Sequence, residues 1–159
     1  MESEVVNSGV NSRWKSLIAP LVIGLVVGIV GWLLNLFLQR YFIEPVFCRS
    51  TDSFAVCSNG GNVAWAIAHI VLAGLSIIVM VRYLVFRPLL VAVAALLSVW
   101  GVAAWLSQMP WYSAIAWQAI LFAFAYALFA WIARNDKFWQ ATLVSAIVVV
   151  ICRLAINLA

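Results

Sequence analysis

The stretch that decides the fold of this chain is residues 17–38, which read LIAPLVIGLVVGIVGWLLNLFL. It contains no charged residue, and a helix of about 20 apolar residues is long enough to cross a hydrocarbon layer about 30 Å thick. Four further apolar runs of similar length follow, at residues 63–81, 89–107, 113–133 and 138–159. The sequence therefore predicts an all-α, polytopic membrane helix bundle with five transmembrane helices.

The composition points to the same class of protein. The chain is 67% hydrophobic and 9% charged, whereas soluble domains are roughly 45–50% apolar and about 25% charged. Residues 17–159 are predicted to form a single transmembrane bundle, and residues 1–16 are polar without apolar periodicity, which predicts a disordered cytoplasmic tail. The segment 39–62 is the one substantial loop, so no separate catalytic domain fits outside the membrane.

The basic residues predict the orientation of the bundle. One set of boundaries carries six of them, whereas the opposite set carries two, Arg40 and Arg49. The six are Arg13, Lys15, Arg82, Arg87, Arg134 and Lys137. The positive-inside rule then predicts a cytoplasmic N-terminus, an extracytoplasmic C-terminus and an extracytoplasmic loop 39–62. Basic residues scattered in this way form no patch for nucleic acid.

Short connections between the runs, with no lipidation motif and no glycosylation sequon outside them, favour the plasma membrane of a bacterium, that is, its inner membrane. The lipid bilayer is then one partner of the chain. A second partner is predicted to be another membrane protein or a second copy of the chain.

Small residues form a stripe along the first run. Gly24, Gly28 and Gly31 recur at helical spacing and lie on one face of the predicted helix. Such a face lets another backbone approach closely, as in GxxxG packing. Packing within the bundle and docking of a partner helix or a second copy are both compatible with this pattern. A comparable alanine stripe occurs in the fourth run, at Ala119, Ala123, Ala127 and Ala130.

Cys48 and Cys57 lie in the predicted extracytoplasmic loop, where an oxidising compartment favours a disulfide between them. The alternative is a redox-active dithiol. In topology alone, this arrangement resembles the quinone-linked disulfide-forming membrane proteins, although their C-x-x-C spacing is absent here. The third cysteine, Cys152, lies inside the last run and is predicted to be an inert thiol.

Six polar residues are predicted to lie at similar depth in the outer leaflet, where together they would form a polar pocket. They are Asn35, Gln39, His69, Gln118, Arg153 and Asn157. Arg153 is expected to extend outward to the membrane surface, or to pair with Glu44 or the terminal carboxylate of Ala159. The alternative is a contact with an anion or a lipid head group in a polar pocket. The lone histidine is predicted to bond to a neighbouring helix and not to ligate a metal. A quinone or a lipid is the possible ligand, and no other cofactor is predicted.

Three functions follow from these features. The first is a non-enzymatic accessory, scaffold or partner-binding membrane subunit, which needs no catalytic constellation. The second is a quinone- or lipid-linked thiol redox protein that uses Cys48 and Cys57. The third is a small oligomeric channel or transporter. Because the sequence contains no P-loop, no H-E-x-x-H and no nucleophile elbow, we favour the first function and predict no catalytic residues.

Overall fold

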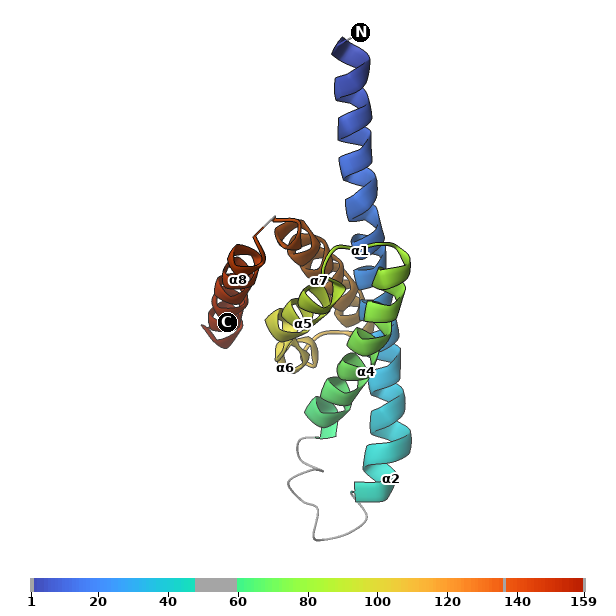
Figure 1. Ribbon diagram of the computed structural model, residues 1–159. Coiled ribbons are helices and arrows are strands. Elements are labelled where there is room, and N and C mark those ends of the chain that lie inside the picture. The colour runs from blue at the N-terminus through green and yellow to red at the C-terminus, as the bar shows by residue number, and fades with distance from the viewer. Residues whose placement is uncertain (1, 48–59, 136, 159) are drawn as a thin grey trace.

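The computed structural model describes residues 2–47, 60–135 and 137–158 of the chain. All the regular structure in these ranges is helical, which confirms the all-α prediction (Figure 1). Within them, four helices are long and apolar enough to cross a membrane, one fewer than the five predicted. They are Leu17–Val46, Gly60–Arg82, Trp111–Ala133 and Phe138–Ile156.

The first helix extends beyond its predicted limits at both ends. Helix α1 spans Glu2–Leu38, continues through the π-helical turn η1 at Gln39–Ile43, and ends in α2 at Glu44–Phe47. Residues 2–16 thus continue helix α1, whereas the sequence predicts a disordered tail for residues 1–16. The predicted loop 39–62 begins late, because residues 39–47 are helical too. In Figure 1 the start of α1 projects well beyond the other helices.

The third predicted span, residues 89–107, is a broken helix. After α4 (Gly60–Arg82), helix α5 covers Pro88–Val99 and α6 covers Val102–Leu106. Between them Gly101 has a φ of +98°, a backbone conformation that glycine adopts readily and other residues rarely do. The apolar run hides this break because the residues around it are as apolar as the helices.

Helix α7, Trp111–Ala133, is the central element of the bundle. It packs against α1, α5 and α8, and α1 packs in turn against α4. The last helix, α8, covers Phe138–Leu158 and contacts α5 and α7. The connections between α4 and α5 and between α7 and α8 are short, so these neighbours run antiparallel.

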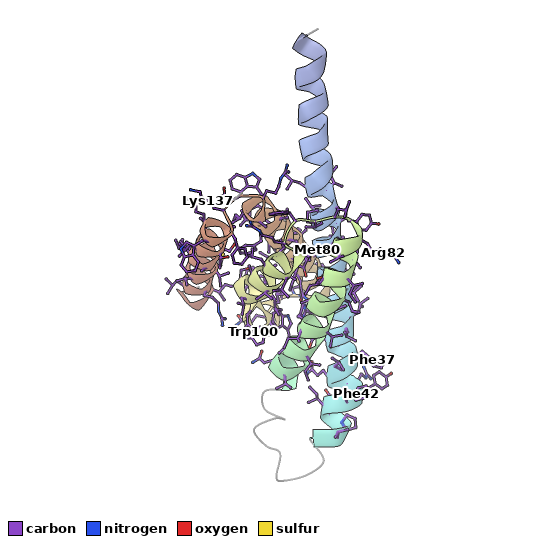
Figure 2. All side chains as sticks on the ribbon, viewed as in Figure 1. Phe37, Phe42, Met80, Arg82, Trp100 and Lys137 are labelled. Carbon is purple, nitrogen blue, oxygen red and sulfur yellow. The ribbon has the colours of Figure 1, made fainter. Side chains whose placement is uncertain are left out.

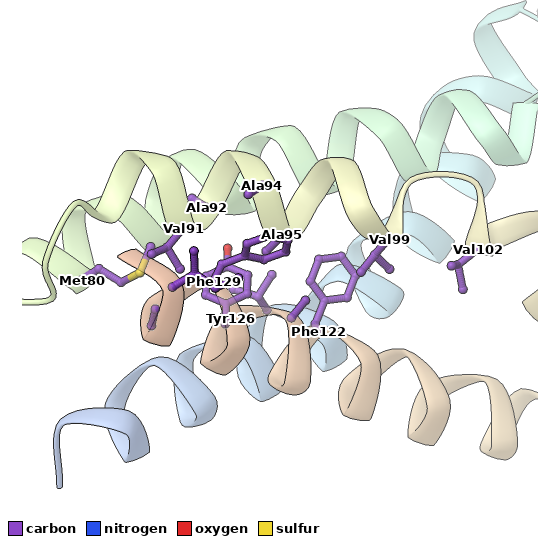
Figure 3. Close-up of a cluster of buried hydrophobic side chains, with 14 of the residues drawn as sticks. Met80, Val91, Ala92, Ala94, Ala95, Val99, Val102, Phe122, Tyr126 and Phe129 are labelled. Carbon is purple, nitrogen blue, oxygen red and sulfur yellow. The ribbon is translucent and has the colours of Figure 1, made fainter. Parts of the chain in front are cut away.

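The core lies between α5 and α7. Figure 3 shows Phe122, Tyr126 and Phe129 of α7 facing Val91 and Val99 of α5. The three aromatic side chains are each 1% exposed. Since lipid tails are as apolar as these side chains, close van der Waals packing and hydrogen bonds hold such helices together. One such hydrogen bond, between the hydroxyl groups of Ser76 and Tyr126, lies in this core.

The outer faces of the helices are apolar too. Figure 2 shows Phe37 and Phe42 pointing away from the bundle, and both side chains are about half exposed. Ile78 on α4 and Phe124 on α7 are more than 60% exposed, at 63% and 66%. In water such faces would favour aggregation. Exposure of these faces to acyl chains carries no free-energy cost, as expected of a membrane bundle.

Candidate functional site

The glycine stripe packs inside the bundle. A Cβ atom on Gly24 would lie 2.5 Å from the carbonyl oxygen of Phe122, and one on Gly28 would lie 2.7 Å from the Cα of Ala119. Both contacts are with the backbone of α7, so the stripe of α1 meets the alanine stripe of α7. A Cβ on Gly31 would instead collide with the imidazole of His69 on α4. Gly31 therefore makes the space that the histidine ring occupies.

His69 is fully buried between two aromatic rings. Its ring is stacked on Trp65, with centroids 4.2 Å apart, and on Phe122, with centroids 5.0 Å apart. Its Nδ1 lies 2.8 Å from the carbonyl oxygen of Trp65, and its Nε2 lies 2.7 Å from Nε2 of Gln118 on α7. The histidine thus joins α4 to α7, which is the bonding role predicted for it.

A polar cavity of about 360 Å³ lies beside this histidine. Its wall comes from α1 and η1, the first turns of α4, helix α6, and α7. Polar side chains of the wall are Asn35, Gln39, Asn62, Ser107 and Gln118, together with the indoles of Trp32 and Trp65. Among the residues that the structure describes, the wall contains no Asp, Glu, Lys, Arg or His. The cavity therefore presents hydrogen-bonding groups without any formal charge.

Three polar atoms of this wall are buried and have no hydrogen-bond partner. They are Oδ1 of Asn35, Nε1 of Trp65 and Oε1 of Gln118. Only one other side-chain atom in the described residues has this status, Oγ of Ser145 on α8. An unpaired buried polar group costs about 1–3 kcal/mol, and a hydrocarbon interior offers no water as a substitute. Three of these four unpaired atoms thus belong to residues that line one cavity, and protein covers all three.

The structure brings together Asn35, Gln39, His69 and Gln118 of the six predicted pocket residues. Arg153 lies elsewhere: its Nη1 donates a hydrogen bond to the carbonyl oxygen of Trp100, 2.8 Å away. A backbone group at the end of α5 thus takes the place expected for Glu44, whereas the terminal carboxylate of Ala159 lies outside the described residues. The break in the third span frees this carbonyl, which sequence reasoning had no means of placing. The side chain of Asn157 lies outside the described residues.

Sequence reasoning missed four polar residues of the wall, Trp32, Asn62, Trp65 and Ser107. Trp65 is one of nine tryptophans, most of which we interpret as interfacial anchors. Its spacing of four residues from His69 places both on one face of a helix and was the available signal. Helix α6 contributes to the wall only because the chain breaks at Gly101, and η1 carries no pattern that predicts a π-turn.

A second cavity, of about 370 Å³, is almost entirely apolar and lies between α5, α6, α7 and α8. Cys152 is part of its wall, is half-buried and is not in a disulfide. Its apolar surroundings agree with an inert thiol. Cys48 and Cys57 lie outside the described residues, so that the disulfide between them stays a prediction.

Metal chemistry finds no support in the described ranges, where no group of three or more His, Cys, Asp and Glu residues lies close enough to hold an ion. Comparisons of this chain with protein-family models, with curated proteins and with solved structures find no match. The function must therefore be argued from the cavity itself.

Proposed function

We propose that this chain is a non-enzymatic accessory membrane protein whose polar cavity binds the uncharged polar head of a membrane amphiphile. The observation that carries the proposal is a cavity of about 360 Å³ whose wall, among the described residues, holds the amide side chains of Asn35, Gln39 and Asn62 and no charged side chain. An amide offers both hydrogen-bond donors and an acceptor to a polar head group that enters. Each hydrogen bond formed in this way contributes about 0.5–1.5 kcal/mol to binding.

The chemistry of the wall favours binding over catalysis. Its polar side chains are amides, indoles and one serine hydroxyl. Ser107 already donates its hydroxyl hydrogen to the carbonyl oxygen of Ala104, 2.7 Å away, and no base lies in the wall to activate it. Amides and indoles do not ionise near neutral pH, so we expect them to recognise a ligand and leave it unchanged.

We also propose that the chain crosses the plasma membrane of a bacterium five times, the third time as the broken pair α5 and α6. Ser107, which directly follows α6, lines the same cavity as Gly61 in the first turn of α4, which supports a full crossing by the broken pair. The N-terminus is cytoplasmic in this proposal and the C-terminus extracytoplasmic.

The charged turns support this orientation. Nη1 of Arg87 donates to the carbonyl oxygen of Asn135, 3.2 Å away, so the α4–α5 and α7–α8 turns lie at one end of the bundle. Figure 2 shows Arg82 and Lys137 toward the end from which α1 projects, and Phe42 toward the other. The basic boundaries thus gather at one end, which the positive-inside rule assigns to the cytoplasm.

Native mass spectrometry of the chain in mild detergent tests the binding function, with 4-hexylphenol as the probe. We expect the wild-type chain to bind one molecule saturably. The variant Ala104→Leu places a larger side chain in the wall, so that less space is left in the cavity, and it should lose this binding. Its matched control is Ala116→Leu, the same change at an exposed position of α7 that should keep it. Absence of saturable binding to the wild-type chain, or equal binding to all three proteins, would overturn the proposal.

A further inference from the structure

Arg153 places a positive charge in the last helix, and no side chain of the surrounding helices opposes it. The residue lies three positions before Ile156, where the apolar span ends, and so about 4.5 Å from that end along the helix axis. Helices α5, α6, α7 and α8 contain no Asp or Glu. A charge inside a membrane span is costly without a partner, so a bound anion would stabilise this position.

One edge of the Arg153 guanidinium is available to such a partner. Nη1 donates to the carbonyl oxygen of Trp100, and the side chain makes no other hydrogen bond or ion pair within the described ranges. In those ranges, the buried side-chain nitrogen and oxygen atoms without a partner belong to Asn35, Trp65, Gln118 and Ser145. Nε and Nη2 of Arg153 are therefore accessible, in keeping with a side chain that is partly exposed. These two N–H groups form the fork that binds two oxygens of a phosphate group side by side.

The apolar cavity between α5, α6, α7 and α8 lies beside this arginine. Its wall includes Cys152 and Ile156, which lie on either side of Arg153 in the sequence. A Cβ on Gly101 would lie 3.4 Å from Nη1 of Arg153 and 3.9 Å from Cγ2 of Ile156. The guanidinium and the wall of the cavity thus meet at the break between α5 and α6.

The cavity suits an acyl chain. Ser98 carries the one hydroxyl of the wall among the described residues, and this hydroxyl already donates to the carbonyl oxygen of Ala95, 2.9 Å away. Phe124 and Trp105 of the wall are 66% and 42% exposed. The cavity therefore opens on the outer face of the bundle, which the acyl chains of the membrane cover. An apolar chain can enter it without passing through water.

From the free guanidinium edge and the adjoining apolar cavity, we infer that this face of the bundle binds one anionic phospholipid. The phosphate group of the lipid accepts hydrogen bonds from Nε and Nη2 of Arg153, and one acyl chain occupies the apolar cavity. Among the described residues, this cavity shares no wall residue with the polar cavity, so the lipid site is separate from the binding function proposed above.

Native mass spectrometry in neutral detergent tests this inference with two lipids that have identical acyl chains. Dioleoylphosphatidylglycerol carries a net negative charge, whereas dioleoylphosphatidylcholine carries none. We expect the wild-type chain to bind the first lipid about tenfold more tightly, the effect of one charge-assisted hydrogen bond. Equal affinities would overturn the inference, and they are the result expected if the terminal carboxylate occupies the guanidinium instead.

Arg153→Gln tests the contact with the head group, because glutamine keeps an N–H donor for the carbonyl oxygen of Trp100 and removes the charge. We expect this variant to lose the preference for the anionic lipid. Arg82→Gln, which removes a charge at the exposed end of α4, should retain it. A preference that persists in Arg153→Gln would overturn the inference. The wild-type comparison needs no variant, so the inference can be tested even if Arg153→Gln does not fold.

Ala155→Leu tests the place of the acyl chain. Ala155 is exposed and belongs to the wall of the apolar cavity, so a larger side chain there leaves less space. We expect both lipids to bind several-fold more weakly, with the preference preserved. Ala146→Leu, the same change at an exposed position of α8 outside the wall, should change neither affinity. Unchanged binding of both lipids to Ala155→Leu would contradict the inference.

Two further outcomes concern other occupants of this face. Glycerol 3-phosphate carries the anionic head without the acyl chains, and we expect it not to displace the phospholipid when both are at the same concentration. Displacement would identify a free phosphate compound as the ligand and would overturn the inference. A dimer that Ala155→Leu dissociates and Ala146→Leu does not would mean that a second copy of the chain fills the cavity, which also overturns it.

Ala104→Leu separates the two sites. Because Ala104 lines the polar cavity and not the apolar one, this variant should lose 4-hexylphenol and keep the phospholipid preference. Loss of that preference in Ala104→Leu would overturn the lipid site on α8. A wild-type chain that prefers the anionic lipid and does not bind 4-hexylphenol would overturn the function proposed for the polar cavity and leave this inference standing.

Discussion

At the residue scale, Gly28 is a position where the bundle leaves no room for a side chain. A Cβ there would lie 2.7 Å from the Cα of Ala119 and 2.9 Å from the carbonyl oxygen of Gln118, both backbone atoms of α7. We expect Gly28→Ala to push α1 away from α7 and to lower the free energy of unfolding by about 1–3 kcal/mol. Thermal unfolding in detergent, followed by circular dichroism, measures this loss.

Gly74→Ala is the matched control for that change. Gly74 is exposed on α4, and no atom lies within 4 Å of a Cβ placed there. Because alanine is the better helix former, by about 1 kcal/mol, this variant should be as stable as the wild type or more so. Equal losses in the two variants would contradict the close approach of α1 to α7.

Tyr126 and Ser76 form a hydrogen bond across the core. The hydroxyl of Ser76 donates to the carbonyl oxygen of Ala73, 2.8 Å away, so the Tyr126 hydroxyl must donate to Ser76 Oγ, also at 2.8 Å. We expect Tyr126→Phe to lower the free energy of unfolding by about 0.5–1.5 kcal/mol, the usual range for one bond between membrane helices. Tyr112→Phe, at an exposed hydroxyl, is the control and should change it by less. Unfolding in mixed micelles measures the free energy of unfolding of both variants. If Tyr126→Phe leaves this free energy unchanged, the hydrogen bond contributes nothing to stability.

At the element scale, α8 holds the end of α5. The break at Gly101 ends α5 inside the bundle and frees backbone carbonyls that lipid cannot satisfy. Arg153 of α8 donates to one of them, that of Trp100. Its positive charge also lies at the C-terminal end of α5, where the helix dipole is negative. One side chain thus compensates for a backbone break in another helix.

Arg153→Met tests this role because methionine keeps an unbranched apolar stem and lacks the donor. We expect the variant to lose about 1–3 kcal/mol of stability, the cost of one unpaired carbonyl. Arg153→Lys, which retains a donor and the charge, should recover part of the loss. The measurement is thermal unfolding in detergent. A gain in stability on removing the charge would mean that Arg153 destabilises the protein and does not stabilise the end of α5.

At the scale of the whole molecule, the arrangement of basic turns predicts which loops face the cytoplasm. We expect a membrane-impermeant maleimide to label Gln108→Cys in intact cells, and to label Leu84→Cys and Lys137→Cys only after permeabilisation. Each variant is made in a chain whose three native cysteines are serine. Leu84, Gln108 and Lys137 are all exposed, so burial does not limit their reaction.

The same labelling counts the crossings. Leu84 and Gln108 flank the broken pair α5 and α6, whereas Gln108 and Lys137 flank α7. Reaction of Leu84→Cys and Gln108→Cys from one side would mean that the broken pair enters the membrane and returns. The proposed five crossings would then be wrong, and four would stand.

Part of the candidate site was predictable from the sequence and part was not. Asn35, Gln118 and His69 are polar residues in apolar runs, and the cost of leaving such groups unpaired in lipid predicts that they meet. Trp65 gives no such signal because tryptophan is common at membrane surfaces. Arg153 was grouped with the site by its depth alone. Depth does not determine which face of a helix a residue occupies relative to distant helices.

The sequence by itself determined the solvent, the helical class and the limits of most of the long helices. These follow from local causes: apolar runs of membrane length, and the need of each backbone group for a hydrogen bond within its own helix. The tertiary structure alone decided that the third run breaks at Gly101, that α1 lies on α7, and that Asn35, Trp65 and Gln118 line one cavity. These depend on contacts between residues far apart in the chain, and hydropathy carries no information about which helices meet.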